Sequence, residues 1–102
     1  YTLHTLFPYT TLFRSYLKVE DDDMIGSRIA KGDIAFGYIT HEIINNSLCL
    51  VEYNDERHIR QIKRLDSNKL LLISNGNSLR TETVTAKDIN VLVKLERIEI
   101  KL

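Results

Sequence analysis

Short runs of β-branched and large apolar residues, separated by turn-forming stretches, fill the chain from Tyr16 onward. The last run alternates strictly, with Ile98, Ile100 and Leu102 set against Glu99 and Lys101, as in a strand with one buried face. The turn-forming stretches are KGD at 31–33, INNS at 44–47, YNDE at 53–56, LDSN at 65–68 and SNGNS at 74–78. YNDE and LDSN each lie between two strand-like runs, which predicts two hairpins.

Helices are nearly excluded by the same pattern. No segment reaches the roughly 10 to 12 residues of an amphipathic helix, and only residues 24–30 and 86–89 are free to make a helical turn. The sequence therefore predicts a mostly β fold, either a small curled sheet or a partly open barrel.

Size and charge limit the classes of function. A chain of 102 residues is at most one domain, and its 14 basic and 14 acidic residues cancel, so no global field favours nucleic acid or acidic membranes. No apolar run approaches the roughly 18 residues of a membrane helix, and no signal-peptide pattern opens the chain. Cys49, in the run LCLV, is expected to be a buried, inert thiol, which fits a reducing compartment. We expect a soluble cytoplasmic domain.

The first fifteen residues are a separate case. Residues 5–15, TLFPYTTLFRS, read as the in-frame translation of a common short-read sequencing adapter, and residues 1–4 lie upstream of it. The alternative is a genuine edge strand rich in threonine and aromatic residues. We predict that residues 1–15 are an adapter-derived artefact outside the fold, and that residues 16–102 form the domain.

Most signatures of a chemical site are absent. The three histidines show no metal-ligand spacing with Cys49 or with one another, and no phosphate-binding loop or nucleophile elbow occurs. The acidic run at residues 20–23 lacks the spaced oxygen ligands of a calcium loop, so neither a metal nor a cofactor is indicated. A basic cluster is compatible with a solvated face or with phosphate contacts: Arg57, Arg60, Lys63 and Arg64.

The order of the strand-like runs carries a resemblance. The succession of runs resembles that in the C-terminal domain of LexA-type repressors. In this chain the runs are YLKV, the acidic stretch EDDDM, KGDIAF, IINNSLCLVEY, HIRQIKRL, KLLLISNGN and DINVLVKLERIEI. That family includes phage repressor C-terminal domains and the UmuD proteins, and is related to signal peptidases. The resemblance covers residues 16–102 and implies the same fold.

In this family a serine in a Gly-Asp-Ser-Met-like motif is the nucleophile, and a lysine on a later strand is its general base. Met24 matches the methionine after the nucleophile, which places Asp23 at the nucleophile position. Arg60 falls at the lysine position, 37 residues further on, and Lys63 is the rival candidate. Strand alternation puts Lys63 on the opposite face from residue 60, so we favour Arg60.

The two substitutions argue against catalysis. A serine–lysine dyad needs a desolvated lysine that loses its proton near neutral pH, whereas an arginine guanidinium stays protonated. Asp23 supplies only a weak carboxylate nucleophile. No catalytic residue of the dyad is intact, and cleavage would need a repositioned pair such as Ser27 with Lys63. We expect instead that the Asp23 carboxylate and the Arg60 guanidinium form an ion pair through two parallel hydrogen bonds.

Three functions stay open at this point. The first is a catalytically inactive dimerisation or sensing domain of a bacterial or phage transcriptional repressor, which acts as a homodimer and meets DNA only through a helix-turn-helix domain preceding Tyr16. The second is an active self-cleaving serine peptidase, the family's default. The third is a stand-alone β-domain that binds a protein or peptide. For the homodimer, the apolar alternation of the terminal LVKLERIEIKL predicts an edge strand that needs covering.

Overall fold

The computed structural model describes residues 1–5 and 15–100, and those residues form a β structure with two single 3-10 turns. The strands are β1 (His4–Thr5), β2 (Ser15–Lys18), β3 (Ile34–Ile39), β4 (Ser47–Tyr53), β5 (Glu56–Arg64), β6 (Lys69–Asn75), β7 (Leu79–Thr85) and β8 (Val91–Glu99). The turns are η1 (Ile25–Ser27) and η2 (Ala86–Asp88), which lie in the two segments expected to turn. The predicted mostly β class is confirmed.

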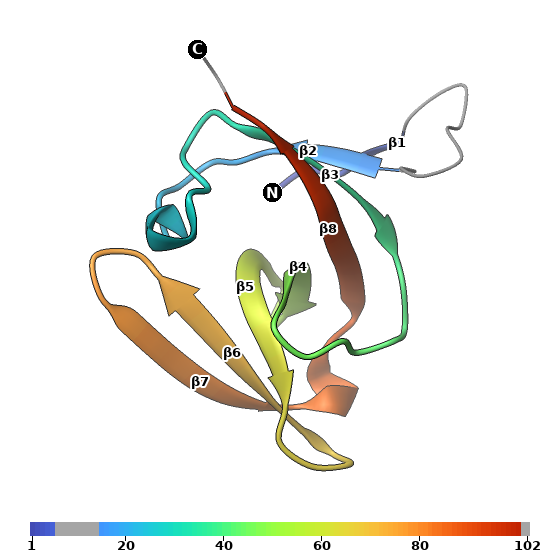
Figure 1. Cartoon of the computed structure of the whole chain (residues 1–102). Helices are drawn as coiled ribbons and strands as arrows, with labels where there is room; N and C mark the ends of the chain where they lie inside the picture. Colours follow the sequence, from blue (N-terminus) through green and yellow to red (C-terminus); the bar gives the residue numbers. More distant parts are fainter. Residues whose placement is uncertain (6–14, 101–102) are drawn as a thin grey trace.

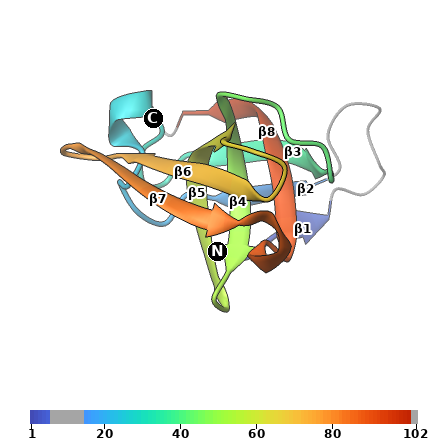
Figure 2. The ribbon, with the colours of Figure 1, turned by 90° about the horizontal axis from the view of Figure 1, so that it is seen from below.

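All eight strands belong to one antiparallel sheet with the order β1-β2-β3-β8-β4-β5-β6-β7. The sheet curls strongly, so that the β6–β7 hairpin bends away from the β2–β3–β8 layer while η1 hangs above the tip of that hairpin (Figures 1 and 2). The expectation of a curled sheet is therefore confirmed.

Both predicted hairpins form. In YNDE, Asn54 and Asp55 have φ angles of 52° and 62°, the left-handed conformation that a two-residue turn requires. In LDSN, the Asp66 carboxylate accepts the N–H groups of Asn68 and Lys69 at 2.8 and 2.9 Å. These bonds lower the pKa of Asp66, because they stabilise its charged form.

The core consists of two clusters on opposite faces of the central strands, since Leu50 and Val93 belong to one cluster and their chain neighbours Val51 and Leu92 belong to the other. One contains Leu17, Val19, Met24, Ile29, Ala35, Leu50, Ile59 and Val93. The other contains Cys49, Val51, Tyr53, Ile62, Leu70, Leu72 and Leu92. Met24, the methionine of the acidic stretch, is thus a core residue. Cys49 is buried as expected, and burial raises the pKa of its thiol.

The C-terminal strand differs from the expected bare edge along part of its length. β8 lies inside the sheet, where residues 91–94 pair with β4 on one side and residues 93–99 pair with β3 on the other. Beyond Lys94 the pairing of β8 with β4 ends. The predicted exposed strand edge is therefore confined to residues 95–99. The strands at the two ends of the sheet are β1 and β7.

The segment similar to a sequencing adapter falls largely outside the described residues, since residues 6–14 are among those not described. Its flanks contact the domain. Tyr1 and Leu3 pack against the first core cluster, and Ser15 pairs with Gly37 in the β2–β3 ladder. The origin of the segment stays a prediction, but Ser15 is part of β2. None of the helical turns in the described part of the chain is long enough to span a membrane.

Candidate functional site

The loop between β2 and β3 presents Asp23. The loop is closed at its base by two hydrogen bonds between backbone groups, Val19 N–H to Asp33 O and Gly32 N–H to Val19 O, each 2.8 Å. Further out, Met24 buries its side chain, and the Asn75 N–H lies 3.0 Å from Asp23 O and 3.3 Å from Met24 Sδ. The loop is therefore tied to the end of β6, which fixes the position of Asp23.

The acidic side chains of this loop have structural partners. Asp21 Oδ1 accepts the N–H of Asp23 at 3.1 Å, and Asp22 Oδ1 accepts the N–H of Lys31 at 2.9 Å. Asp33, which is buried, accepts the N–H of Ala30 at 3.0 Å. Carboxylates that accept backbone N–H groups in this way shape turns. The crowding of like charge is thus explained in part by the loop geometry.

Arg60, on β5, reaches the carboxylate of Asp23. Its Nη2 lies 3.4 Å from Asp23 Oδ2, while its Nη1 donates to its neighbour's carbonyl, Ile59 O, at 2.8 Å. The expected ion pair forms, but the expected bidentate geometry is wrong, because the second nitrogen is used by the backbone. The Arg60 side chain is 14% exposed and that of Asp23 is 47% exposed, so the pair lies at the edge of the solvent.

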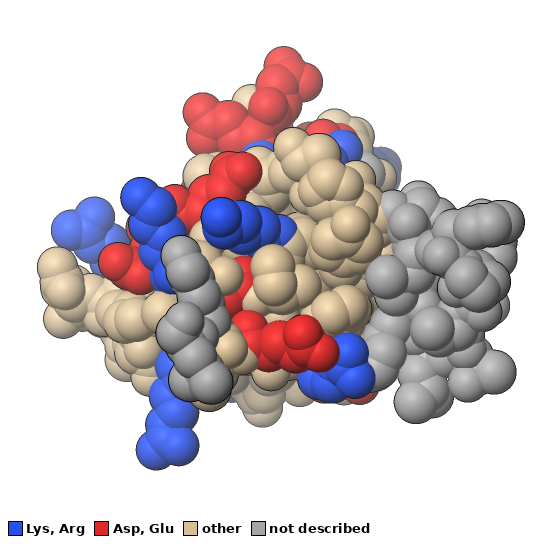
Figure 3. All heavy atoms as spheres, turned by 90° about the horizontal axis from the view of Figure 1, so that it is seen from above, with Lys and Arg blue, Asp and Glu red and all other residues tan. Residues whose placement is uncertain are grey.

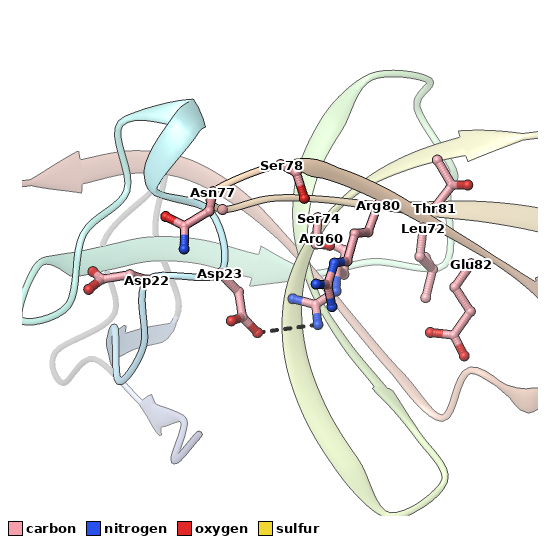
Figure 4. Close-up of a pocket in the computed structure, with 11 residues that line it drawn as sticks. Asp22, Asp23, Arg60, Leu72, Ser74, Asn77, Ser78, Arg80, Thr81 and Glu82 are labelled. Atoms are coloured by element: carbon pink, nitrogen blue, oxygen red, sulfur yellow. Dashed lines mark hydrogen bonds and ion pairs between the residues drawn. The ribbon is translucent and has the colours of Figure 1, made fainter.

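The pair stands in a cleft of about 730 Å³ between the Asp23 loop and the β6–β7 hairpin (Figure 4). Its lining residues are Asp22, Asp23, Arg60, Leu72, Ser74, Gly76, Asn77, Ser78, Arg80, Thr81 and Glu82. The lining thus combines two arginines, three carboxylates and several small polar groups. Such a surface suits a polar, extended ligand better than a compact apolar one.

Sequence reasoning missed a second polar contact, which is made by Glu82, one of the residues that line the cleft. Tyr53, on β4, is buried and donates its hydroxyl hydrogen to Glu82 Oε2, on β7, at 2.6 Å. Burial and this carboxylate together raise the pKa of Tyr53 to about 12. The residues are 29 positions apart, and only the bending of β6 and β7 over β4 and β5 brings them together. No local motif signals such a contact.

The sequence model of the Peptidase S24-like family matches residues 9–95. The chain belongs to this family. The match spans Asp23, Arg60 and both arms of the β6–β7 hairpin, and it confirms the resemblance to LexA-type C-terminal domains. No curated protein is similar enough to the chain to count as a relative.

Within this S24-like domain, the repositioned pair Ser27 and Lys63 is not brought into the cleft. Ser27 lies in η1, where its Oγ accepts a hydrogen bond from Asn75 Nδ2 at 3.4 Å. Lys63 is exposed on β5 opposite Leu71, and neither residue lines the cleft. Of the residues considered for the dyad, only Asp23 and Arg60 lie together.

The basic cluster does not form one patch. Arg57 pairs with Glu52 at 3.0 Å, and Arg64 donates to the carbonyl oxygens of Asp66 and Ser67, both at 3.3 Å. On the face seen in Figure 3, lysine and arginine side chains are interspersed with acidic ones rather than gathered. On that face, the distribution of charge gives no support to a surface for binding phosphates.

The chemistry available at Asp23 and Arg60 is charge pairing rather than proton transfer. A guanidinium has no lone pair with which to accept a proton at neutral pH, and it holds five donors in a fixed planar fork. A carboxylate is a weak nucleophile compared with the alkoxide of an activated serine. With 3.4 Å between Arg60 Nη2 and Asp23 Oδ2, the two opposite charges attract.

Proposed function

We propose that this S24-like domain is a pseudoenzyme, a catalytically inactive dimerisation or sensing domain of a cytoplasmic transcriptional repressor from a bacterium or phage. The observation that carries the proposal is the contact between Asp23 and Arg60 at 3.4 Å. A carboxylate and a guanidinium at the two dyad positions compensate each other's charge, and neither can perform the role of the residue that it replaces. The DNA-binding part would be a separate helix-turn-helix domain, and the domain described here would hold two such parts together.

A cleavage assay tests the inactivity. The protein, joined to a segment of the kind that this family cleaves, is incubated from neutral to alkaline pH and followed by mass spectrometry. We expect no cleavage by the unmodified protein. The double variant Asp23→Ser with Arg60→Lys should cleave slowly at alkaline pH, because a lysine loses its proton there and can activate the serine.

The two single variants are the matched controls. Asp23→Ser alone leaves no base, and Arg60→Lys alone leaves no hydroxyl, so neither should cleave. Cleavage by the unmodified protein would overturn the inactivity. A double variant that folds and binds the segment yet never cleaves would argue against the placement of Asp23 and Arg60 at the dyad positions.

A fusion assay tests the repressor role. The domain is joined to a helix-turn-helix domain that cannot dimerise by itself, and repression of a reporter with a two-fold symmetric operator is measured. Repression should be restored, since dimeric DNA-binding proteins need both half-sites engaged. Failure with a stable, soluble fusion would remove the dimerisation role.

The cleft supports a second candidate, the binding of a protein or peptide without cleavage. Its volume of about 730 Å³ and its paired charges fit an extended polar segment. Fluorescence anisotropy with a labelled peptide of the cleavable kind distinguishes the candidates. Binding that is lost in Arg80→Ala, together with failure of the fusion assay, would favour this function over the first.

A further inference from the structure

Asn75 and Gly76 form a reactive dipeptide at the tip of the β6–β7 hairpin. Asn75 is the last residue of β6, and residues 76–78 connect it to β7. It is the only asparagine in the sequence that a glycine follows. An asparagine before a glycine loses its side-chain amide readily, because no Cβ on the next residue hinders the approach of that residue's backbone nitrogen to the side-chain carbonyl. Asn75 is therefore the asparagine of this chain that local chemistry makes most reactive.

The reaction needs only the chain and water. The backbone nitrogen of Gly76 forms a bond to Cγ of Asn75, the bond from Cγ to Nδ2 breaks, and ammonia leaves with the proton of the Gly76 N–H. Water then opens the resulting cyclic imide. Opening at Cγ gives aspartate, whereas opening at the backbone carbonyl gives isoaspartate, in which the main chain runs through the former side chain. No oxidant, reductant or cofactor takes part.

The Gly76 nitrogen is available for this attack. Gly76 lies outside the paired residues of β6 and β7, and its N–H donates no hydrogen bond to any described residue. The side-chain amide of Asn75 is held only by a bond from Nδ2 to Ser27 Oγ at 3.4 Å, which is long for a hydrogen bond. Neither of the two reacting groups is therefore locked by a strong contact.

Asn75 also ties the loop between β2 and β3 to the hairpin. Its N–H lies 3.0 Å from Asp23 O and 3.3 Å from Met24 Sδ, and its side chain reaches Ser27 in η1, which lies above the hairpin tip (Figure 1). A Cβ at Gly26 would overlap the Asn75 amide, so this amide fills the space beside η1. One residue thus holds both the Asp23 region of the loop and η1.

Both products of deamidation weaken this attachment. Aspartate replaces the donor Nδ2 by a charged oxygen, next to a loop whose residues 20–23 are all acidic, and like charges repel. Isoaspartate lengthens the main chain by one carbon between residues 75 and 76. The tip is packed closely enough to register that change, since a Cβ at Gly76 would lie 3.4 Å from Asp22 O and 3.5 Å from Asp23 O.

We propose that Asn75 is a site of spontaneous deamidation, and that its conversion to aspartate or isoaspartate releases the loop carrying Asp23 from the β6–β7 hairpin. The chain cannot restore the amide by itself, so the geometry of the cleft changes with the age of the protein. The proposal goes beyond the proposed function and does not depend on dimerisation or on cleavage.

Incubation of the folded protein for days at mildly alkaline pH tests the site, because the attacking backbone nitrogen must lose its proton. Peptide mapping by mass spectrometry gives the converted fraction at each asparagine. Asn77 is an internal comparison, since it lies exposed in the same connection but precedes Ser78. Conversion at Asn75 should be at least about tenfold faster than at Asn77, because only Asn75 precedes a residue without Cβ.

Gly76→Ala is the matched control. A Cβ at this position makes no contact shorter than 3.4 Å, so the variant should fold, as circular dichroism would verify. The added methyl group should slow conversion at Asn75 about tenfold, to the level of Asn77, because it hinders the attack.

Hydrogen exchange tests the consequence. The converted protein carries an additional negative charge and is separated from the unconverted protein by ion exchange. The N–H groups of Ser27 and Arg28, which donate to Met24 O and Ile25 O, should exchange at least about tenfold faster after conversion, since η1 loses its attachment. Asn75→Asp supplies the charge without the longer main chain and should show part of this acceleration.

Each outcome decides one part of the proposal. Conversion at Asn75 that is no faster than at Asn77 would show that the fold protects the dipeptide, and would overturn the site. Conversion that Gly76→Ala does not slow would overturn the attack by the Gly76 nitrogen. Unchanged exchange in η1 after conversion would overturn the release of the loop. Fast conversion that Gly76→Ala suppresses, followed by faster exchange in η1, establishes the proposal whatever the cleavage and fusion assays show.

Discussion

Replacing Arg60 and Asp23 by alanine, singly and together, measures how much the ion pair contributes to stability. At 3.4 Å the Coulomb energy of two unit charges in bulk water is about 1 kcal/mol, and immobilising two side chains offsets part of it. Asp23 is 47% exposed, so water screens the pair and solvates the carboxylate when its partner is removed. We therefore expect a coupling energy of about 0.5 kcal/mol, at most about 1 kcal/mol.

The single variants should be unequal. Asp23→Ala should cost no more than about 0.5 kcal/mol, the usual range for an exposed position. Arg60→Ala should cost about 1–2 kcal/mol, because the 14% exposed side chain also loses its packing and its hydrogen bond to Ile59 O. Arg60→Met, which keeps the apolar stem and removes the charge, is the matched control and should recover part of that loss.

Urea unfolding with linear extrapolation gives these free energies, and repeating it at high salt tests the electrostatic origin of the coupling. The coupling should shrink with salt, while the packing contribution of Arg60 should not. A coupling above about 2 kcal/mol would show that the pair is desolvated, in contrast to the exposure of Asp23. A coupling of zero at low salt would show that the cost of immobilising the two side chains cancels their attraction.

Three further outcomes follow from the structure. Gly37→Ala should destabilise the protein by more than about 2 kcal/mol in urea unfolding, since a Cβ at this position would meet the backbone carbonyl of Lys94. Gly76→Ala is the control and should be tolerated, because a Cβ there would lie 3.4 Å from its nearest neighbour, Asp22 O. The pKa of Tyr53 is raised to about 12, so the stability that its hydroxyl contributes should be complete below about pH 10 and decline as the pH rises through 12. This contribution is measured as the difference in unfolding free energy between the parent protein and Tyr53→Phe, determined over a range of pH. Removing residues 1–14 should change the unfolding free energy by less than about 0.5 kcal/mol if they are foreign to the fold, and a loss above about 2 kcal/mol would show that they belong to it.

The strands could be predicted because their signals are local. Alternation and turn residues placed both hairpins, and the two left-handed residues of YNDE are of types that tolerate positive φ. The order of strands in the sheet is not local. Residues 91–99 look like an edge from their sequence, yet part of this strand lies between β3 and β4, because the chain returns to the middle of the sheet at its end.

The candidate site was predictable in position but not in geometry. Met24 located Asp23, and strand alternation favoured Arg60 over Lys63, which the structure leaves exposed and outside the cleft. The single rather than bidentate contact could not be anticipated, because it depends on Arg60 Nη1 being taken by Ile59 O. The contact of Tyr53 with Glu82 depends on how far the sheet curls, which the alternation of single strands does not encode.

The tip of the β6–β7 hairpin connects the two walls of the cleft. There the Asn75 N–H contacts both Asp23 O and Met24 Sδ, and so holds the loop that carries the carboxylate of the ion pair. Ser74, the residue before it, pairs with Arg80, and both side chains line the cleft. The position of Asp23 therefore depends on the same short stretch of hairpin that forms the opposite wall of the cleft. The separation of the ion pair and the shape of the cleft are for this reason not independent features of the structure.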